Sequence, residues 1–518
     1  MLTHVGSSGY VFAVTQRQPV PNIAAGLLAR PAWQRCAVFL LLGGLAGLGQ
    51  APLDIWPATI LALAILLYLH SKTTAPRPAV LHVWLFGIGY FAFSLRWIIE
   101  PFLVDIARHG WMAPFAICLM AAGAALFWAV AAWCACRVSL RNAPMLGLAI
   151  VIAEVTRSLI LTGFPWALLG HVWISTGLAQ LAAFGGPHLL SLISMIAAWA
   201  LVSLAGRFRV IGIVTLGLLV TVSFVLRPGP ADPVAADAPV VRIVQPNALQ
   251  HQKWDPAYRD VFLNRLVTLT GQGATPDLVV WPETSVPYLL NYIEDDLSLF
   301  SEAVRGAPLV FGVQRADTER RFYNSLVVMD AGGRVQSIYD KQHLVPFGEY
   351  IPGAGLLGRV GAAGLARNLG SGFTSGDVPG PIDLPGIGAA IPLICYEGIF
   401  AEELTDGGDR ARLLLLITND AWFGQAAGPY QHLAQARLRA IEQGLPMVRA
   451  ANTGISAMID AKGRILSQLG LDRDGALDVA LPPALPPTLY AQFGDWPFLA
   501  VLFLLTLGCY GLSRREGD

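Results

Sequence analysis

Long apolar runs separated by short polar connections fill the first 226 residues, and one more lies near the C-terminus. A helix needs about 20 mostly apolar residues to cross the roughly 30 Å hydrocarbon core of a bilayer. We therefore predict eight spans, near residues 36–50, 55–70, 80–99, 114–136, 143–162, 187–205, 209–226 and 496–512. The first two runs are short, so a single span with a re-entrant piece is the alternative there, and the count is eight plus or minus one.

The composition agrees with a membrane protein. Of the 518 residues, 54% are hydrophobic and 14% are charged, and the mean hydropathy is +0.54. Such a chain is too apolar for a soluble globular protein of this size. The formal net charge is zero and no basic cluster contains interleaved aromatic residues, which argues against a nucleic-acid partner.

The basic residues predict the orientation of the spans. Lys and Arg accumulate in the short cytoplasmic loops of membrane proteins. If the spans alternate, most of the basic loop residues fall on one side: Arg17, Arg30, Arg35, Lys72, Arg77, Arg137, Arg141, Arg207, Arg209, Arg514 and Arg515. We therefore expect both termini in the cytoplasm and the polar region outside it. Within one span, Glu154 and Arg157 lie three residues apart, so we expect them to pair; binding a lipid headgroup is the alternative.

The pattern changes after a Pro/Ala-rich linker at 227–239. Short β-branched runs separated by turn residues predict strands at 240–247, 276–283, 307–314, 325–330, 334–340, 389–397, 411–420 and 447–454. Helical periodicity appears at 255–270, 292–306 and 431–444. This alternation predicts an α/β domain with a layered core.

A short sequence repeat suggests two similar halves in this domain. The residues D-A-x-G-R occur at 330–334 and again at 460–464, and each segment is typical of a hairpin turn. A two-fold pseudo-symmetric sandwich would explain the repeat, and two unrelated hairpins would also produce it.

Cys395 is the one cysteine of the polar region, in the run IPLICYEGIF. The other five cysteines lie in apolar segments, where a free cysteine behaves as a small hydrophobic residue. Because no disulfide framework or CxxC pair is present, Cys395 is either a catalytic nucleophile or a core residue. His343, His432 and the other histidines lack metal-ligand spacing, so we expect no metal and no organic cofactor.

Two charged residues at the ends of predicted strands could activate this thiol. Glu283 ends PDLVVWPE and Lys341 follows RVQSIYD, although either could be an ordinary surface charge. A thiol with a pKa of about 8.5 is mostly protonated at neutral pH, so it needs a base, a nearby cation or both. Glu283 would remove the proton, and Lys341 with the N–H of Tyr396 would stabilise the oxyanion.

The order Glu, Lys, Cys in these contexts resembles the nitrilase, or carbon–nitrogen hydrolase, superfamily. The motifs WPET, K-x-x-L-V-P-F-G-E-Y-I-P and I-C-Y-E carry this resemblance, and with the flanking spans nearly the whole chain is similar to bacterial apolipoprotein N-acyltransferases. The resemblance implies a multi-span α-helical membrane bundle plus an α/β nitrilase-like αββα sandwich domain. The expected segments are a cytoplasmic 1–35, a bundle of seven spans at 36–226, the linker 227–239, an extracytoplasmic catalytic domain at 240–490, a final span at 496–512 and a cytoplasmic tail at 513–518.

The same resemblance implies roles for individual residues. Glu283 is the general base, Lys341 the oxyanion stabiliser and Cys395 the nucleophile. Glu349 and Glu397 match positions that support this triad, with ordinary carboxylates as the alternative. Three aromatic residues match positions near the family's site, although each could equally pack in a core: Trp254, Tyr396 and Trp422.

The implied activity is acyl transfer in the bacterial inner membrane. Cys395 would take an acyl chain from a phospholipid as a thioester and pass it to the α-amine of the N-terminal diacylglyceryl-cysteine of a lipoprotein, with ping-pong kinetics. We expect a monomer. A membrane-tethered amidase or nitrilase that hydrolyses a small amide is the first alternative, and a transporter or receptor with an inactive nitrilase fold is the second.

The glycine-rich segment 353–376 follows Lys341 and Glu349 in the chain. Its leucines suggest a lid that dips into the membrane surface and controls entry of the acyl chain.

Overall fold

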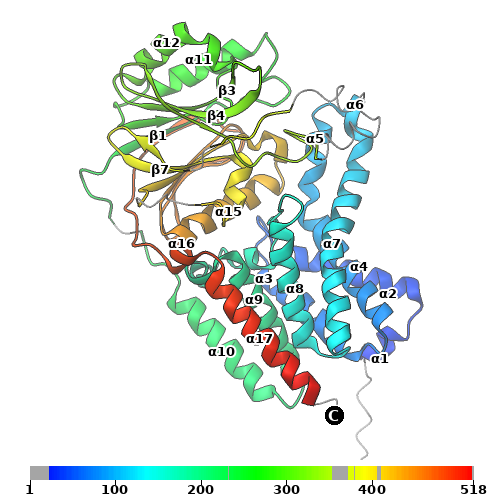
Figure 1. Cartoon of the computed structure of the whole chain (residues 1–518). Helices are drawn as coiled ribbons and strands as arrows, with labels where there is room; N and C mark the ends of the chain where they lie inside the picture. The colour runs from blue at the N-terminus through cyan, green and yellow to red at the C-terminus, as the bar shows by residue number, and fades with distance from the viewer. Residues whose placement is uncertain (1–22, 232, 353–371, 378–379, 405–409, 516–518) are drawn as a thin grey trace, which may run out of the picture.

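The chain folds into a helical bundle that carries an α/β sandwich on one end (Figure 1). The computed structural model describes residues 23–231, 233–352, 372–377, 380–404 and 410–515. The long bundle helices are α2 (Ala32–Gly47), α3 (Trp56–Lys72), α4 (Pro76–Ser94), α7 (Ala113–Val138), α8 (Ala143–Leu159), α9 (Ala182–Ser203), α10 (Arg209–Val225) and α17 (Trp496–Arg515). Shorter helices are α1 (Ile23–Leu28), α5 (Glu100–Leu103), α6 (Ile106–His109) and α16 (Leu489–Phe493). The segment 353–371, and with it the proposed lid leucines, lies outside the described residues.

Prolines and glycines explain the local form of the bundle. Helices α3, α4, α7 and α8 each carry a proline in the first turn, where the missing N–H would have had no partner in the helix. Gly43 of α2 and Gly89 of α4 allow these two helices to touch through their backbones. A Cβ atom at Gly43 would lie 1.9 Å from the carbonyl oxygen of Phe86, and one at Gly89 would lie 2.0 Å from that of Leu40. Such close backbone approach is typical of helix pairs in membranes.

All eight predicted spans lie on helices of the structure. Among the described residues, three helical stretches are long and apolar enough to cross a membrane: Ile106–Val138, Gly177–Ser203 and Trp496–Arg514. A fourth arises if Pro76–Ser94 and Arg96–Leu103, which are bent by 63° to each other, form one span. Helices α2, α3 and α10 are apolar but shorter. The protein is therefore a membrane protein with several apolar helices, and the count of eight remains a prediction.

Glu154 and Arg157 are both buried and their charges interact, but in the described part of the chain no ion pair within 4.0 Å joins them, contrary to our expectation. Glu154 accepts a hydrogen bond from the N–H of Leu169 at 3.0 Å. The Nη1 atom of Arg157 donates to the carbonyl oxygen of Trp166 at 2.9 Å and also to that of Phe164. The prediction of a direct ion pair was wrong. Backbone N–H and C=O groups of the buried loop after α8 also require hydrogen-bond partners, and the two charged side chains supply them.

The sandwich consists of two six-stranded mixed sheets. Their strand orders are β12-β1-β2-β3-β4-β5 and β6-β7-β8-β9-β10-β11. The first sheet holds β1 (Val240–Gln245), β2 (Leu278–Val280), β3 (Leu309–Ala316), β4 (Phe322–Met329), β5 (Val335–Asp340) and β12 (Gly475–Ala480). The second sheet holds β6 (Ile382–Leu384), β7 (Gly388–Ile394), β8 (Leu413–Thr418), β9 (Met447–Ala451), β10 (Ser456–Ile459) and β11 (Ile465–Leu469).

The two sheets are equivalent in strand direction. In each order the first pair is antiparallel, the next two pairs are parallel and the last two are antiparallel. The two D-A-x-G-R segments close the last hairpin of each sheet in the same way. The N–H of Asp330 bonds the carbonyl oxygen of Arg334 at 2.9 Å, and that of Asp460 bonds the carbonyl oxygen of Arg464 at 2.9 Å. The repeat therefore marks equivalent positions, as a pseudo-symmetric sandwich requires.

Helices cover both outer faces of the sandwich and create the αββα order. Helices α11 (Arg259–Thr270) and α12 (Glu294–Val304) pack on the first sheet, and α15 (Gly428–Gln443) packs on the second. Because both faces of the central strands are buried, those strands are apolar at almost every position. The expected fold class, a multi-helix bundle with an αββα sandwich, is confirmed.

Helix α15 also joins the sandwich to the bundle, and it lies between them in Figure 1. Its Gln431 is 3% exposed and has a partner for every polar atom of its amide. The amide oxygen accepts from the indole N–H of Trp166 at 2.7 Å, and the amide nitrogen donates to the carbonyl oxygens of Ala51 at 3.2 Å and Ser94 at 3.0 Å. One side chain of the sandwich thus bonds three separate parts of the bundle.

We predict that Gln431→Ala lowers the thermal stability of the purified protein. The change would leave the indole N–H of Trp166 and two carbonyl oxygens buried without partners, at about 1–3 kcal/mol for a group left unsatisfied. Thermal unfolding in detergent, followed by tryptophan fluorescence, measures the effect.

The matched control is Gln468→Ala, which truncates an exposed glutamine of β11 and is expected to change stability by less than about 0.5 kcal/mol. Equal unfolding temperatures for the two variants would show that Gln431 does not hold the sandwich on the bundle.

Candidate active site

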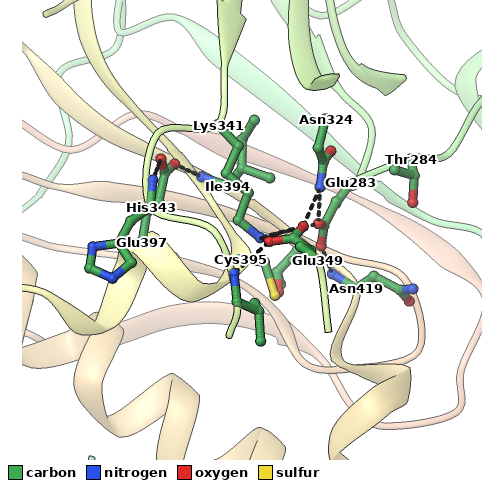
Figure 2. Close-up of polar contacts among 12 residues, drawn as sticks. Glu283, Thr284, Asn324, Lys341, His343, Glu349, Ile394, Cys395, Glu397 and Asn419 are labelled. Atoms are coloured by element: carbon green, nitrogen blue, oxygen red, sulfur yellow. Dashed lines mark hydrogen bonds and ion pairs between the residues drawn. The ribbon is translucent and has the colours of Figure 1, made fainter. Parts of the chain in front are cut away.

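The three predicted catalytic residues come together from the ends of three strands. Glu283 follows β2, Lys341 directly follows β5 and Cys395 directly follows β7. In Figure 2 their side chains converge, with the sulfur of Cys395 beside the carboxylates and the ammonium group. The Nζ atom of Lys341 lies 3.9 Å from Oε1 of Glu283. The three residues are 6%, 1% and 6% exposed, so this is a site shielded from bulk water.

Glu283 is held by two hydrogen bonds that leave its carboxylate next to the thiol. Its Oε1 accepts from Nδ2 of Asn324 at 2.7 Å, and its Oε2 accepts from the backbone N–H of Asn419 at 2.7 Å. Asn324 lies in β4 of the first sheet, whereas Asn419 follows β8 of the second. The position of this carboxylate therefore depends on both sheets.

Lys341 is a buried cation paired with two carboxylates. Its Nζ atom donates to the carboxylate of Glu349 at 2.9 Å, in addition to its contact with Glu283. Burial alone would lower the pKa of Lys341, but the charges of Glu349 and then Glu283 outweigh it, and the pKa is raised above its ordinary value. Lys341 is consequently an ammonium group, the form that stabilises an oxyanion.

Cys395 stands at a sharp turn between β7 and the short 3₁₀ helix η6 (Cys395–Ile399). Its φ angle is +52°, a left-handed conformation that few non-glycine residues adopt and that is often found at functional sites. Burial and the charge of Glu283 raise the pKa of the thiol, while Lys341 and a hydrogen bond with Thr418 oppose that rise. The resting residue is therefore a thiol that needs a base.

Glu349 and Glu397 have different positions in the site. Glu349 contacts Lys341 directly and accepts from Asn324 Nδ2 at 3.2 Å. Glu397 instead braces the backbone, because it accepts from the N–H groups of Ile394 at 2.7 Å and Gln342 at 2.7 Å. Burial raises the pKa of Glu397 to about 7, although these hydrogen bonds act against it. Glu397 thus ties the turn at Cys395 to the segment that follows Lys341.

The three predicted aromatic residues divide into one buried and two exposed side chains. Tyr396 is 6% exposed, and its hydroxyl donates to the carbonyl oxygen of Gly163 in the bundle at 3.4 Å. Trp254 and Trp422 are 46% and 41% exposed, so the alternative of core packing is wrong for both.

Lys253 is a buried part of the site that the sequence analysis missed. Its Nζ atom donates to the backbone carbonyl of Glu283 at 3.2 Å and to Oγ1 of Thr284 at 2.8 Å. Burial lowers its pKa to about 8, while the charges of Glu283 and Cys395 act in the opposite direction. The local sequence does not predict that a lysine in a polar loop is buried. The neighbouring aromatic residue, Trp254, is the one local feature that suggests a packed environment for Lys253.

A second missed feature lies behind Cys395. His432 of α15 is fully buried, with Nε2 at 3.2 Å from the carbonyl oxygen of Cys395 and Nδ1 at 2.9 Å from Oδ1 of Asp420. Asp420 also forms a buried ion pair with Arg449 and accepts from Thr418 Oγ1 at 2.9 Å. Burial raises the pKa of Asp420, but Arg449 and His432 outweigh it and lower the pKa to about 2. This charged network supports the turn that presents the thiol.

Among the described residues, no group of three or more His, Cys, Asp and Glu side chains is arranged to hold a metal ion. The chemistry that this geometry supports is nucleophilic attack by sulfur on an acyl carbon, with a carboxylate as base and an ammonium group as oxyanion partner.

Comparison with known proteins identifies the family. Residues 241–485 match the family described as Carbon-nitrogen hydrolase, and residues 42–200 match the Apolipoprotein N-acyltransferase N-terminal domain. A solved amidase from Nesterenkonia sp. shares 21% identity, with a TM-score of 0.37 over 52% of this chain and 99% of the amidase.

Relatives that carry the name apolipoprotein N-acyltransferase match almost the whole chain. An apolipoprotein N-acyltransferase of Rhodopseudomonas palustris is 36% identical, and the alignment covers 97% of this chain and 99% of the relative. One of Caulobacter vibrioides is 38% identical over 91% of this chain and 93% of the relative. Since both the bundle and the sandwich match, this chain belongs to the apolipoprotein N-acyltransferase family.

Proposed function

We propose that this acyltransferase moves an acyl chain from a phospholipid to a diacylated lipoprotein through a thioester on Cys395. In the first half-reaction Glu283 takes the thiol proton, and the sulfur attacks the ester carbonyl of the phospholipid. The ester C–O bond then breaks, a thioester forms and the departing lysophospholipid oxygen receives the proton from Glu283.

In the second half-reaction the acceptor is the α-amine of an N-terminal diacylglyceryl-cysteine. The amine attacks the thioester carbonyl, Glu283 accepts a proton from the nitrogen, and the C–S bond breaks. The proton returns to sulfur, so Glu283 and Cys395 end as they began. Because the first product leaves before the acceptor reacts, ping-pong kinetics are expected.

Both tetrahedral intermediates carry a negative oxygen, and two donors are suited to it. Lys341 is an ammonium group whose burial strengthens its interaction with a charge that develops nearby. The N–H of Tyr396 belongs to the first turn of η6, where backbone donors have no partner within the helix. In this proposal Glu349 holds Lys341, and Glu397 holds the turn between β7 and η6.

The observation that carries the proposal is the convergence of Glu283, Lys341 and Cys395 on a sandwich mounted on a membrane bundle. A phospholipid leaves the bilayer at a cost of about 0.8 kcal/mol for each exposed CH₂ group, so the thiol has to work at the lipid surface. Exposed aromatic side chains on the segments that form the site support access for an acyl chain: Trp254, Phe347 and Trp422, at 46%, 81% and 41% exposure.

We further propose that the protein is a monomer of the bacterial inner membrane with both termini in the cytoplasm. The domain boundaries 36–226, 227–239, 240–490 and 496–512 belong to this proposal, with 1–35 and 513–518 on the cytoplasmic side. Helices α3, α7 and α17 end on the side of the bundle opposite the sandwich (Figure 1). Their last turns or the loops that follow carry Lys72, Arg137 and Arg514, and this charge asymmetry supports an extracytoplasmic sandwich.

The acyl-enzyme is directly testable. We predict that incubation with phospholipid alone adds one acyl group to Cys395, visible by intact-mass and peptide mass spectrometry and removed by hydroxylamine, with release of lysophospholipid. Cys395→Ala should gain nothing. A diacylated lipopeptide should then discharge the enzyme and become triacylated.

Two outcomes of this experiment would contradict the proposal. Release of free fatty acid at the same rate with and without lipopeptide would favour the amidase or nitrilase alternative, in which water is the acceptor. A Cys395 that gains no acyl group although the protein is folded would favour the inactive-fold alternative.

We predict opposite effects of Glu283→Gln on two reactions. Because the charge of Glu283 raises the pKa of the Cys395 thiol, its removal should lower that pKa, and iodoacetamide should alkylate Cys395 at lower pH than in the unmodified enzyme. Acyl transfer should nevertheless fall by about 10²–10⁴-fold, since the base is lost.

Two comparison variants sharpen this prediction. Lys341→Met should move alkylation to higher pH, because Lys341 opposes the rise in the thiol pKa. Glu319→Gln removes a carboxylate that is 71% exposed and should change neither reaction. If Glu283→Gln shifted alkylation upward in pH, the charge relation between Glu283 and Cys395 would be refuted.

The orientation can be tested with a membrane-impermeant maleimide on spheroplasts. In a background with all six native cysteines replaced by Ala, Glu319→Cys in the sandwich should be labelled in intact spheroplasts. Arg141→Cys, in the loop between α7 and α8, should be labelled only after permeabilisation. The reverse pattern would place the sandwich in the cytoplasm.

A further inference from the structure

Two adjoining cavities open at the end of the bundle that is opposite the sandwich. Ala51, just before α3, contacts Gln431 of the sandwich. From there α3 extends over 17 residues, or roughly 25 Å at 1.5 Å per residue, and ends at Lys72. The cavities lie around this end, between α1, α2 and the start of α4. They are therefore remote from Cys395 and are not part of the active site.

The walls of these cavities are basic. The larger one, about 330 Å³, is lined by Arg35, Lys72 and His82, together with residues of α1 and of the loop between α3 and α4. The smaller one, about 210 Å³, is lined by Arg35, Arg77 and His82. No aspartate or glutamate is among the described residues that line either cavity. Each cavity is thus lined by two permanent cations, one of them the shared Arg35, with no described carboxylate in its wall to balance them.

Buried polar atoms in the walls lack partners. His82 is 5% exposed and stacks on Phe39 with ring centroids 4.1 Å apart, yet its Nδ1 atom has no hydrogen bond among the described residues. The Nε atom of Arg35 is buried and also lacks a partner there, although its Nη1 atom donates to the carbonyl oxygen of Leu28 at 3.1 Å. Buried polar groups of native proteins are nearly always satisfied, so these two atoms are available as hydrogen-bonding groups for a ligand in the cavities.

Exposed tryptophans place the cavities at the level of lipid headgroups. Trp33, two residues before Arg35, is 71% exposed. Trp133 near the end of α7 is 49% exposed and carries the guanidinium of Arg137 at 4.6 Å from its ring centroid. Tryptophan is enriched at membrane–water interfaces, where its ring sits among the headgroups. Apolar Leu81, 41% exposed, lines the smaller cavity and offers a surface for an acyl chain.

We propose that these cavities bind the phosphate of an anionic phospholipid headgroup, in the leaflet opposite the one that faces the sandwich. The guanidinium groups of Arg35 and Arg77 suit phosphate oxygens because of their planar donor geometry, and Lys72 adds a positive charge. Nδ1 of His82 gains a hydrogen-bond partner from the same headgroup. This lipid is distinct from the acyl donor, which has to reach Cys395 at the other end of the bundle.

The test uses the full-length protein in an uncharged detergent, titrated with phosphatidylglycerol, phosphatidylcholine or glycerol 3-phosphate. Native mass spectrometry counts the bound molecules, and thermal unfolding reports stabilisation. Phosphatidylglycerol should bind and raise the unfolding temperature. Phosphatidylcholine, which has no net charge, and glycerol 3-phosphate, which has no acyl chain, should each bind at least tenfold more weakly.

Variants distinguish this site from general attraction of anionic lipid to basic loops. Arg35→Gln combined with Arg77→Gln should weaken the binding of phosphatidylglycerol at least tenfold. Arg137→Gln combined with Arg141→Gln removes the same charge from the same end of the bundle but outside the cavities, and it should leave the affinity unchanged. Because Arg35 is half-buried, Arg77→Gln alone, an exposed change, serves as the second pocket variant and should weaken binding several-fold.

Three results would overturn the proposal. The first is equal affinity of the pocket variants and the loop variant for phosphatidylglycerol. In that case the basic residues of the cavities would set the orientation of the protein in the membrane and would not bind a lipid. The second is equal binding of phosphatidylglycerol and phosphatidylcholine, which would remove the anionic selectivity. The third is binding of glycerol 3-phosphate as tight as that of the lipid, which would make the ligand a soluble phosphate.

Discussion

The buried ammonium group of Lys341 is the constraint on which the active site depends. A lysine that is 1% exposed keeps its charge only if carboxylates compensate for the lost hydration, and Glu349 and Glu283 do so. These carboxylates come from different segments, and Asn324 donates to both of them. Glu283 is bonded in addition to the backbone after β8 of the opposite sheet. The charged centre can therefore form only when the two sheets are packed in the correct register.

The thiol is presented by a turn that is supported on two sides. Glu397 holds the backbone at Ile394 and the segment after Lys341, while His432 lies against the carbonyl group of Cys395. The contacts of Glu397 and His432 are buried, and hydrogen bonds are stronger where water is excluded. They hold Cys395 in its left-handed backbone conformation. The cost of the strained turn is thus offset by hydrogen bonds that form only in the folded domain.

Helix α15 connects this turn to the membrane part of the protein. His432 faces Cys395, and the preceding residue, Gln431, bonds the bundle at three points. Tyr396, directly after the nucleophile, adds a contact to Gly163 of the bundle. The rings of Trp97 and Trp166 in the bundle also pack on Phe423, and Trp166 packs on His432, so bundle residues lie next to those that support the nucleophile. In this chain the turn that presents the thiol is thus bonded to the membrane helices through the same helix and loop.

The sequence by itself predicted the helices of the bundle and most strands of the sandwich, but not β6 or β12, and it selected Glu283, Lys341 and Cys395 as candidate catalytic residues. These features depend on local patterns: apolar runs, β-branched runs and short motifs at strand ends. Only the tertiary structure decided which other residues surround the site: Lys253, Asn324 and the His432–Asp420–Arg449 network. It also decided that Glu154 and Arg157 bond a loop in place of each other. Finally, it decided that Trp254 and Trp422 are exposed. The physical reason is that each of these outcomes depends on which polar groups are left without water once distant segments pack, and no local pattern records that.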